Sequence, residues 1–492
     1  MGLAVAALLG VAAWGSARQT SDSTYGSLGS SAMGTLQTVL YAGEGRWRSC
    51  TRDDCPPIAR DWGADALTYD AYLRWKTTKD PRALAVLRDI ARYRYLYGTC
   101  GAADCTEWSD VPEWDAVAAA REYEATHDAY DLARAQAAFD SVERSDAYAG
   151  GACPDVRYQR PALERNQPGG EGRVKTLETE ANAVKAALLL YAATHEPSYL
   201  QIAQRRYAAS RRAFRDKALP LYTVWVLDDG AGCPQVRGRF YASVNGLMIW
   251  NGLALARWTY DDSYRRDALA TARAVETRLA DGRGIFANLQ AENDIAEPLV
   301  EAMLGLSSSQ GDGAQSARTW LLRNAAAAAG ARRSDGTYGR FFDGPAPQAP
   351  ATAWQTSGGL ALAIAAAAVD SDGALPAASG WPAAASRAAD VETASLPATI
   401  SFTGSGIALI GTVGERCCQH GHARVYVDGV ETVDRTGIWQ NKMNWGKPFA
   451  DSVLFAWRWP ASGRHRIEIE PAAENPKEGG TFVHVRSELI LP

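Results

Sequence analysis

The chain has 492 residues, with 51 Lys and Arg against 56 Asp and Glu, which gives a formal net charge of −5. This length exceeds what a single hydrophobic core usually supports, so we expect at least two domains. No stripe of Lys and Arg interleaved with aromatic residues is present, so the sequence lacks the electrostatic footprint of a nucleic-acid-binding protein. We therefore expect no nucleic acid among its partners.

The first residues are typical of an export signal. Residues 3–14 form an apolar run that is too short to span a bilayer, and Gly15, Ser16 and Ala17 follow it like a cleavage site. We expect a signal peptide over residues 1–17. The positively charged stretch that usually precedes such a run is missing, so an uncleaved anchor or a misassigned start is the alternative. A signal peptide or an anchor would export the protein, and we expect it to be secreted or at the cell surface.

The even number of cysteines favours disulfide bonds in an oxidising compartment. The eight are Cys50, Cys55, Cys100, Cys105, Cys153, Cys233, Cys417 and Cys418. The first two pairs each enclose four residues, the third pair can join across the sequence, and the last two are vicinal. A zinc site is the rival interpretation, but no C-x2-C pair is present and there are only six histidines. We expect no metal and no cofactor.

Residues 30–370 are rich in alanine, have helical periodicity and contain a repeated phrase. In this phrase an aromatic residue is followed three positions later by Thr and then by an acid. The copies are Trp75-Thr78-Asp80, Tyr123-Thr126-Asp128 and Tyr191-Thr194-Glu196, with a degenerate copy at Trp258-Asp261. Two of the acids precede Pro, and an acid before Pro is typical of the start of a helix. Each copy therefore predicts the turn of a helical hairpin.

Hairpins that repeat along a chain bury their apolar faces by stacking on their neighbours. The four marked hairpins, with apolar segments at 296–306 and 358–369, bring the number to six. Six hairpins predict a mainly α domain, an (α/α)6 toroid over residues 30–370. An open helical scaffold is the alternative. The 358–369 segment is too short to be a membrane span.

The composition changes after the helical region. Residues 371–384 are rich in Ala, Pro, Gly and Ser and predict a linker. Residues 385–492 contain short segments of alternating polarity, and Asp428-Gly429 between two β-branched runs predicts a β-hairpin. We expect a C-terminal β-sandwich with a jelly-roll-like arrangement.

Carboxylates and aromatic residues concentrate at 108–115. Cleavage of a glycosidic bond needs two carboxyl groups, and Asp110 and Glu113 would share one face of a helix. The same Asp-x-x-Glu spacing is also that of a capping box. Glu180, in the first turn of another predicted helix, could face a cleft or simply favour the helix dipole. Adjacent Asp228 and Asp229 indicate a turn more than catalysis, with a calcium loop as a further option.

Four tryptophans fall near predicted loops or helix starts, where sugar rings could stack on them. They are Trp62, Trp108, Trp114 and Trp225. Packing is the alternative role for each.

The order of these features from about residue 45 to 345 resembles glycoside hydrolase family 76, the endo-α-1,6-mannanases. The resemblance rests on Trp62 before Tyr69-Asp70, on Asp110-Val111 before Trp114, on Gly150-Gly151, on 175–180, and on Ser243-Val244-Asn245-Gly246. The C-terminal strands are similar to galactose-binding-like modules through 425–429 and 463–467.

The resemblance implies that Asp110 is the nucleophile of a two-carboxylate mechanism. Where the family has a second Asp as acid/base, this chain has Val111, which cannot transfer a proton. Glu113 and Glu180 are then the candidate replacements. The residues expected to bind substrate are Trp62, Asp70, Trp108, Trp114, Asn182, Trp225 and Asn245.

We therefore expect a secreted, monomeric glycoside hydrolase that acts on a cell-wall or capsular polysaccharide, with possible association with the cell surface. A catalytically silent glycan-binding protein on the same toroid, or a structural surface protein that presents the β-sandwich, are the alternatives.

Overall fold

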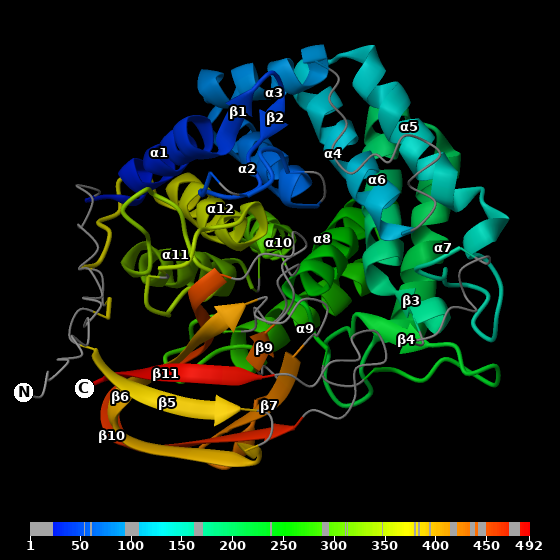
Figure 1. Cartoon of the computed structure of the whole chain (residues 1–492). Helices are drawn as coiled ribbons and strands as arrows, with labels where there is room; N and C mark the ends of the chain where they lie inside the picture. Colours follow the sequence, from blue (N-terminus) through cyan, green and yellow to red (C-terminus); the bar gives the residue numbers. More distant parts are fainter. Residues whose placement is uncertain are drawn as a thin grey trace, which may run out of the picture.

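The computed structural model describes residues 23–492 with gaps. The gaps are 54, 60–61, 94–107, 162–170, 237–238, 288–294, 310, 312, 347, 378–379, 382–383, 393–394, 414–420, 433–437, 441–448 and 472–482. A ring of helices is followed by an antiparallel β domain (Figure 1).

Among the described residues, six helices form an inner ring. They are α2 (Trp62–Thr78), α4 (Asp110–Thr126), α6 (Leu177–Thr194), α8 (Ala242–Thr259), α10 (Glu297–Ser307) and α12 (Ala353–Val369). Each packs against the next, and α12 packs against α2, which closes the ring. This closure confirms the predicted toroid and excludes the open scaffold.

A second layer of helices surrounds the ring. It consists of α1 (Tyr25–Thr35), α3 (Pro81–Tyr93), α5 (Ala129–Glu143), α7 (Pro197–Phe214), α9 (Asp262–Arg278) and α11 (Ala314–Gly330). An inner helix is covered by inner neighbours and by the outer layer, so it needs apolar or small residues nearly all round. The segment α12 is the clearest case, since most of its side chains are buried.

The two ends of the helical domain meet where α1 lies beside α12 (Figure 1). The backbone N–H groups of Tyr25 and Gly26 donate to the carbonyls of Gly373 and Ser371, at 3.1 and 2.9 Å. A Cβ at Gly26 would lie 2.7 Å from the Ser371 carbonyl oxygen, so only glycine allows this approach. The first outer helix thus begins at Tyr25, slightly before the expected start at residue 30.

The repeated phrase forms the turns from inner to outer helices, as the sequence predicts. At the end of α4, the Thr126 hydroxyl donates to the Glu122 carbonyl at 2.8 Å and accepts from the Asp128 N–H at 3.1 Å. His127 between them is left-handed, with φ of 57°. The Asp128 carboxylate then caps α5 by accepting from the Tyr130 N–H at 2.9 Å.

The degenerate copy keeps the same turn. The Thr259 hydroxyl donates to the Leu255 carbonyl and accepts from the Asp261 N–H, and Tyr260 is left-handed. The structural unit is therefore Thr-x-acid, and the aromatic residue is the variable part. All these turns lie at the C-terminal ends of inner helices. The longer connections that lead into the inner helices lie at the opposite end of the ring, which we call the loop end.

Two short antiparallel strand pairs belong to these longer connections, the first a hairpin and the second formed by strands that α6 and α7 separate in sequence. They are β1 (Tyr41–Gly43) with β2 (Arg46–Trp47), ahead of α2, and β3 (Val174–Thr176) with β4 (Trp225–Leu227), ahead of α6 and α8.

The C-terminal domain is one antiparallel sheet in the described residues, in the order β5-β11-β6-β10-β7-β8, with β9 paired to β7. The strands are β5 (Ala385–Glu392), β6 (Ala398–Val413), β7 (Gly421–Val427), β8 (Val430–Glu431), β9 (Ile438–Gln440), β10 (Phe449–Pro471) and β11 (His484–Leu491). Asp428 and Gly429, both with positive φ, make the predicted hairpin between β7 and β8. Both halves of β6 contribute to one core, through Phe402 and Leu409, so the sheet folds over on itself.

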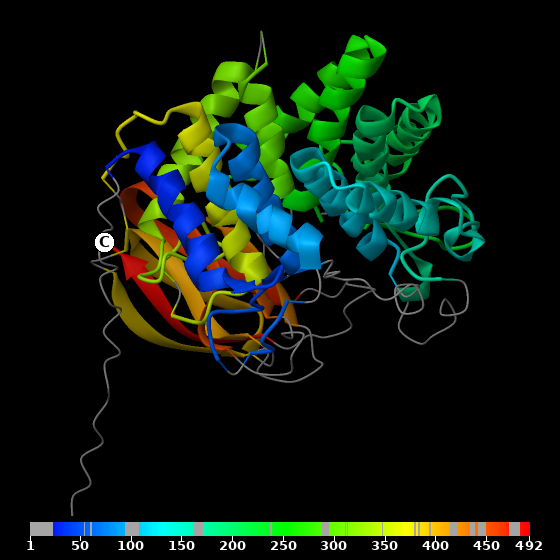
Figure 2. The ribbon, with the colours of Figure 1, turned by 90° about the horizontal axis from the view of Figure 1, so that it is seen from above.

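The β domain packs against connections at the loop end of the ring, near α11 and α12 (Figures 1 and 2). Phe341, from the connection between those helices, packs on Ala408 and Leu489. The Arg458 guanidinium pairs with the Asp343 carboxylate at 3.0 Å, and Arg283, ahead of α10, pairs with the same carboxylate.

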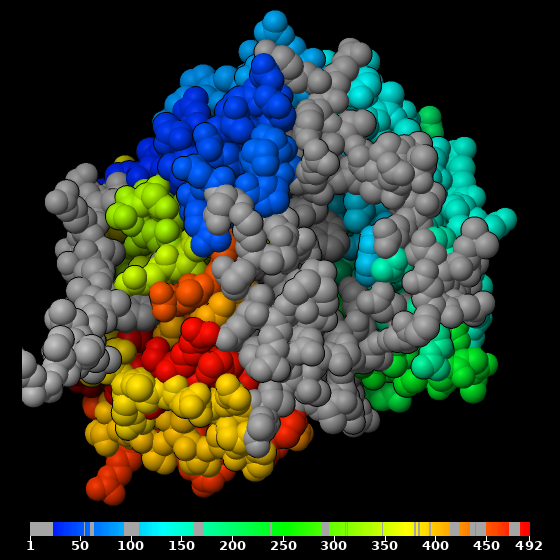
Figure 3. Space-filling model, in the orientation of Figure 1, coloured from blue at the N-terminus to red at the C-terminus, as the bar shows by residue number. Residues whose placement is uncertain are grey.

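The segment expected to be a linker takes part in this contact, because the Trp381 indole N–H donates to the Asp343 carbonyl at 3.1 Å. The space-filling view shows the β domain, in yellow to red, lying directly beneath the helical domain (Figure 3). The β domain is therefore held against the ring by buried side chains.

Two predicted disulfides are confirmed, Cys50–Cys55 and Cys153–Cys233. The other four cysteines and the expected signal peptide at 1–17 lie outside the described residues. Within the part of the chain that is described, no helix combines the length and hydropathy that a membrane crossing requires.

The hydroxyl of Thr126 should stabilise the α4–α5 turn. Thr126→Val keeps the shape but removes the bonds of the hydroxyl to the Glu122 carbonyl and the Asp131 carboxylate and from the Asp128 N–H. We expect the free energy of unfolding to fall by about 1 kcal/mol. Thr277→Val is the matched control, since the Thr277 hydroxyl has one hydrogen bond among the described residues, to the Arg273 carbonyl. Equal changes in chemical denaturation of the two variants would contradict the role assigned to the turn.

The contact between the domains should depend on pH. Burial and the charge of Asp343 raise the pKa of Asp281 to about 8. A carboxyl that holds its proton more tightly when folded lowers stability as the pH rises from its unfolded pKa of about 4 towards about 8. Asp281→Asn removes this titration. We expect the stability of the variant relative to wild type to increase between about pH 5 and pH 8.5 by more than about 1 kcal/mol.

Thermal melts at the two pH values measure this difference. Asp216→Asn is the control, because Asp216 also accepts backbone N–H groups in a turn but lies in a different connection. A difference from wild type that stays constant with pH for Asp281→Asn would contradict the prediction.

Candidate functional site

A small pocket with a volume of about 10 Å³, room for roughly one water molecule, lies inside the ring between α2, α4 and the start of α10. Asp65 and Tyr69 of α2, Trp114 and Ala118 of α4, and Glu297 and Pro298 of α10 are among the residues that line it. Since all six belong to the N-terminal parts of their helices, the pocket is at the loop end. Two carboxylates and two aromatic rings converge there.

Helical spacing explains which side chains face this pocket. Asp65 and Tyr69 are four residues apart and so share a face of α2. Trp114 and Ala118 have the same spacing on α4, and Asp110 lies four residues before Trp114. Asp110 therefore begins the stripe of α4 that faces the pocket, and its side chain is buried.

The capping-box interpretation of Asp110 does not describe this helix. Asp110 is the first residue of α4, the residue before it is Ser109, and no side-chain cap is formed there. The Ser109 hydroxyl instead donates to the Tyr158 carbonyl at 2.9 Å and lies 2.7 Å from the Thr179 hydroxyl of α6. These bonds fix the start of α4 against α6.

A second buried carboxyl stands behind the pocket. Asp70 of α2 is fully buried, and its carboxyl oxygens have no hydrogen-bond partner among the described residues. Burial, and then the charge of Glu297, raise the pKa of Asp70 well above its ordinary value. Burial and the nearby charge of Glu297 therefore favour the protonated form of Asp70.

Asp65 has a different environment. Its negative charge is one of those that favour the charged form of Arg134 on α5. An acid that interacts with a cation favours its ionised form. The two pocket acids therefore differ in their charged neighbours, which are Arg134 for Asp65 and Asp70 for Glu297.

Below the pocket, one carboxylate joins four inner helices. Glu301 of α10 accepts hydrogen bonds from Tyr69 of α2, Arg121 of α4 and Lys185 of α6, the last at 2.6 Å. The Arg121 guanidinium also lies over the Tyr69 ring, 4.2 Å from its centroid. Burial, and then the charge of Arg121, lower the pKa of Lys185 well below its ordinary value. This network fixes the floor of the pocket through Tyr69.

The structure places Glu113 and Glu180 away from the pocket lining. Glu180 accepts from the backbone N–H of Arg157 at 2.7 Å and pairs with Arg206 of the outer helix α7 at 3.2 Å. Arg206 also pairs with Glu143 at the end of α5, at 2.6 Å. Burial, and then the charge of Glu143, raise the pKa of Glu113 well above its ordinary value. Both glutamates thus belong to a buried cluster between inner and outer helices.

Several of the other residues predicted to bind substrate instead contact neighbouring parts of the protein. The Asn245 amide accepts from the Tyr222 N–H at 2.9 Å and donates to the Tyr222 and Tyr241 carbonyls. Trp225 is buried with its ring edge-on to that of Tyr241. Asn182 is buried and donates to a carbonyl of its own helix.

The surroundings of the remaining candidate residues differ from one to the next. Trp108 is half-buried and lies under the Arg160 guanidinium, 3.9 Å from the ring centroid. Trp62 begins α2, and its side chain lies outside the described residues. Asp228 accepts from the Ala152 N–H at 2.9 Å and from the Gly230 N–H in its own turn, which agrees with turn chemistry.

Sequence reasoning missed Asp65 and Glu297 as site residues. Glu297-Pro298 opens the predicted apolar segment at 296–306, and an acid before Pro had already marked helix starts elsewhere. Asp65 has the helical spacing to Tyr69 that would place both on one face. Both signals were present, but neither distinguishes the loop end from the turn end of the ring.

Comparison with known proteins supports the fold of the ring. No protein-family model matches the chain, and no curated protein matches it by sequence. Among solved structures, the α-1,6-mannanase GH76A of a Salegentibacter species matches with a TM-score of 0.59 at 18% identity, over 70% of this chain and 99% of that one. An inactive variant of that enzyme, with two consecutive aspartates replaced by asparagine, was solved with α-1,6-mannotriose.

Two further structures agree. A family 76 glycoside hydrolase (mannosidase) of Bacteroides thetaiotaomicron matches with a TM-score of 0.59 at 15% identity, over 70% of this chain and 98% of that one. A Listeria innocua protein matches with a TM-score of 0.56 at 18% identity, over 70% and 97%. The helical domain of this chain therefore has the fold of the family 76 glycoside hydrolases, the α-1,6-mannanases.

Proposed function

We propose that this protein is a glycoside hydrolase that acts on a cell-wall or capsular polysaccharide. The observation that carries the proposal is the pocket at the loop end of the ring, which Asp65, Glu297 and Trp114 line. Asp110 lies on the same face of α4 as Trp114. A hydrolase of this kind needs one carboxyl that carries a proton and one that is ionised. An aromatic face beside them suits a sugar ring.

Asp110 is the proposed nucleophile. It lies at the N-terminus of α4, where the helix dipole favours the carboxylate form that attacks an oxocarbenium-like centre. The resemblance to family 76 assigns it the same role. The inactive asparagine variant of the Salegentibacter mannanase supports the view that aspartates are essential in that enzyme.

Glu297 is the proposed proton donor, in place of the acid that Val111 cannot supply. Glu297 lines the pocket, and the Asp70 carboxyl beside it, whose pKa is raised well above its usual range, holds a proton that the pair would supply to the leaving group. Glu113 and Glu180, the candidates from sequence, are among arginines of the outer layer. This position makes them less suited to reach a sugar than Glu297.

Linear α-1,6-linked mannan is the first substrate to test, because mannanases of this fold bind α-1,6-mannooligosaccharides. The β domain packs on the same end of the ring as the pocket, through the connections that precede α10 and α12. We propose that it binds the same polysaccharide and extends the surface along which the chain lies. Export of the protein is part of this proposal.

The alternative is a protein that binds glycan without cleaving it. Val111 favours this alternative, because it removes one of the paired acids of the family. Affinity electrophoresis in gels that contain mannan, with analysis of released oligosaccharides by mass spectrometry, separates the two. Retardation without any product would favour the silent binder.

Asp110→Asn should abolish hydrolysis while the protein still folds. The substitution keeps the shape of the side chain but removes the attacking charge, so we expect kcat to fall by about a thousandfold or more. Asp128→Asn is the matched control, because Asp128 caps α5 and asparagine caps nearly as well as aspartate. Wild-type rates for Asp110→Asn on the polysaccharide would end the proposed mechanism.

The activity of Glu297→Gln should be partly restored on substrates whose leaving group needs no protonation. A true proton donor is bypassed when the leaving group needs no protonation, so the loss of about a hundredfold or more on mannan should shrink on an activated aryl glycoside. Glu180→Gln and Glu113→Gln should show no such difference between substrates. If activity on the aryl glycoside is restored in only one of these two variants, the substituted residue of that variant is the proton donor.

Asp70→Asn gives an independent test of the same pair. It removes the neighbouring carboxyl that makes ionisation of Glu297 unfavourable, so the basic limb of the pH–rate profile should shift to lower pH. An unshifted profile would show that Asp70 does not influence the proton donor.

A further inference from the structure

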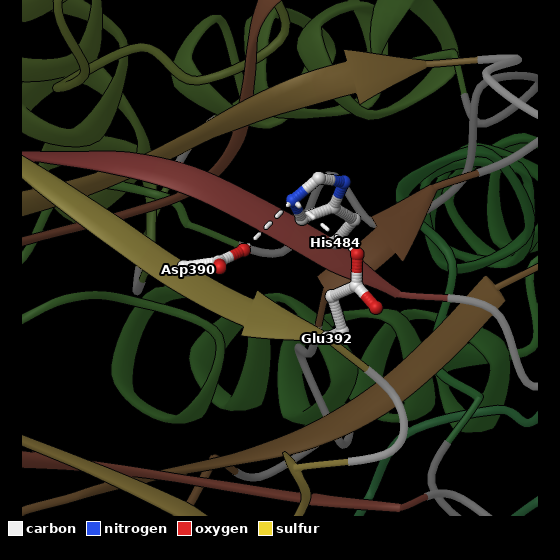
Figure 4. Close-up of side chains that lie close together, drawn as sticks. All are labelled: Asp390, Glu392 and His484. Carbon is white, nitrogen blue, oxygen red and sulfur yellow. Dashed lines mark ion pairs between the residues drawn. The ribbon is translucent and has the colours of Figure 1, made fainter.

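Three potential metal ligands converge on the β domain, outside the pocket of the ring. They are Asp390 and Glu392 of β5 and His484 of β11 (Figure 4). In the part of the chain that the structure describes, this is the one group of three His, Cys, Asp or Glu side chains whose ligating atoms all lie within 4.8 Å of one another. His484 Nε2 is 3.3 Å from Asp390 Oδ1 and 3.9 Å from Glu392 Oε1.

Strand pairing brings these side chains together. Glu392 and His484 are directly opposite in the antiparallel ladder between β5 and β11. Directly opposite residues project from the same face of a sheet, and so do residues two apart on one strand. Asp390 therefore joins Glu392 and His484 on that face. The backbone register, and not only the choice of side-chain rotamers, sets the convergence.

The charges and the spacing suit a cation. Even a protonated imidazole neutralises only one of the two carboxylates, so the group keeps a negative charge that a dication would balance. Two ligand atoms bound about 2.0–2.1 Å from a tetrahedral ion lie about 3.4 Å from each other. The separations of 3.3 and 3.9 Å are close to this value. Small side-chain rotations would therefore complete the coordination.

We propose that Asp390, Glu392 and His484 bind one divalent transition-metal ion of the Zn²⁺ type. An imidazole nitrogen with two carboxylates suits Zn²⁺, whereas Ca²⁺ and Mg²⁺ prefer sites built from oxygen ligands alone. Three protein ligands leave the fourth position of the ion to water.

The proposed ion would stabilise the edge of the sheet. The outermost strand of the sheet path is β5, and Glu392 is its last residue, whereas His484 is the first residue of β11. An ion held by both strands binds the folded state only, so it should raise the melting temperature and slow amide exchange in β5. If His484 and the acids form only an ion pair, added metal should change neither the melting temperature nor the amide exchange of β5.

Calorimetric titration of the full chain with Zn²⁺ tests the proposal, with Co²⁺ as a spectroscopic probe of the coordination geometry. We expect one equivalent to bind to this site, and Asp390→Asn and His484→Ala each to weaken that binding by more than about tenfold. Asp390 is exposed, so its substitution should not disturb the fold. The melting temperature without metal checks this for each variant.

His465→Ala is the matched control. His465 is the other described histidine of this domain that pairs with a carboxylate, Asp428 at 2.9 Å, but it has one such partner instead of two. Its substitution should leave Zn²⁺ affinity unchanged. No binding of Zn²⁺ by the wild type, or equal binding by wild type and both site variants, would overturn the proposal.

Discussion

The closure of the inner ring is the constraint on which the rest of the structure depends. Each inner helix buries its surface against two inner neighbours and the outer layer, and this requires that α12 return to α2 and that α1 cover α12. Since the inner helices all run in the same direction, their N-termini gather at one end. The pocket, the long connections and the contact with the β domain are all located at that end.

The two ends of the ring have different roles. The short turns that stabilise the hairpins lie at one end, and the carboxyls of the candidate site lie at the other. The short Thr-x-acid turns at one end are held by local hydrogen bonds that recur from hairpin to hairpin. The loop end has longer connections of unequal length. The Asp70 carboxyl remains there in a low-dielectric interior with no hydrogen-bond partner in the part of the chain that the structure describes. Such groups lower stability, and their position at the centre of the ring is best explained by a role in proton transfer.

Local signals were sufficient to predict the hairpin repeat, the toroid, the β domain and the Cys50–Cys55 disulfide. Cys153–Cys233 joins residues 80 positions apart and was predicted from the even number of cysteines. The Thr-x-acid phrase encodes its own turn, and Asp428-Gly429 encodes a hairpin through the left-handed conformation of both residues. The direction in which a buried carboxyl points is not local. Glu113 and Glu180 resemble site residues in sequence, but Arg206 and Glu143 of the outer helices determine their environment.

The pocket acids were missed for the same reason, since Asp65 and Glu297 meet only after the ring closes. The contact between the domains was also beyond sequence reasoning. A segment rich in Ala, Pro and Gly predicts a linker, yet Trp381 within it bonds to the Asp343 carbonyl, and Asp343 pairs with Arg458 of β10. Buried ion pairs between distant segments have no signature in local composition.

We propose that a glycosidic bond is cleaved beside Glu297, at the pocket between α2, α4 and α10. Because this pocket has a volume of about 10 Å³, it must open when the sugar chain binds. A crystal structure of the Asp110→Asn variant soaked with α-1,6-mannotriose tests it most directly. We expect a sugar ring against Trp114, with a glycosidic oxygen within hydrogen-bond distance of the Glu297 carboxyl. A trisaccharide bound elsewhere on the chain, with the pocket filled only by water, would contradict it.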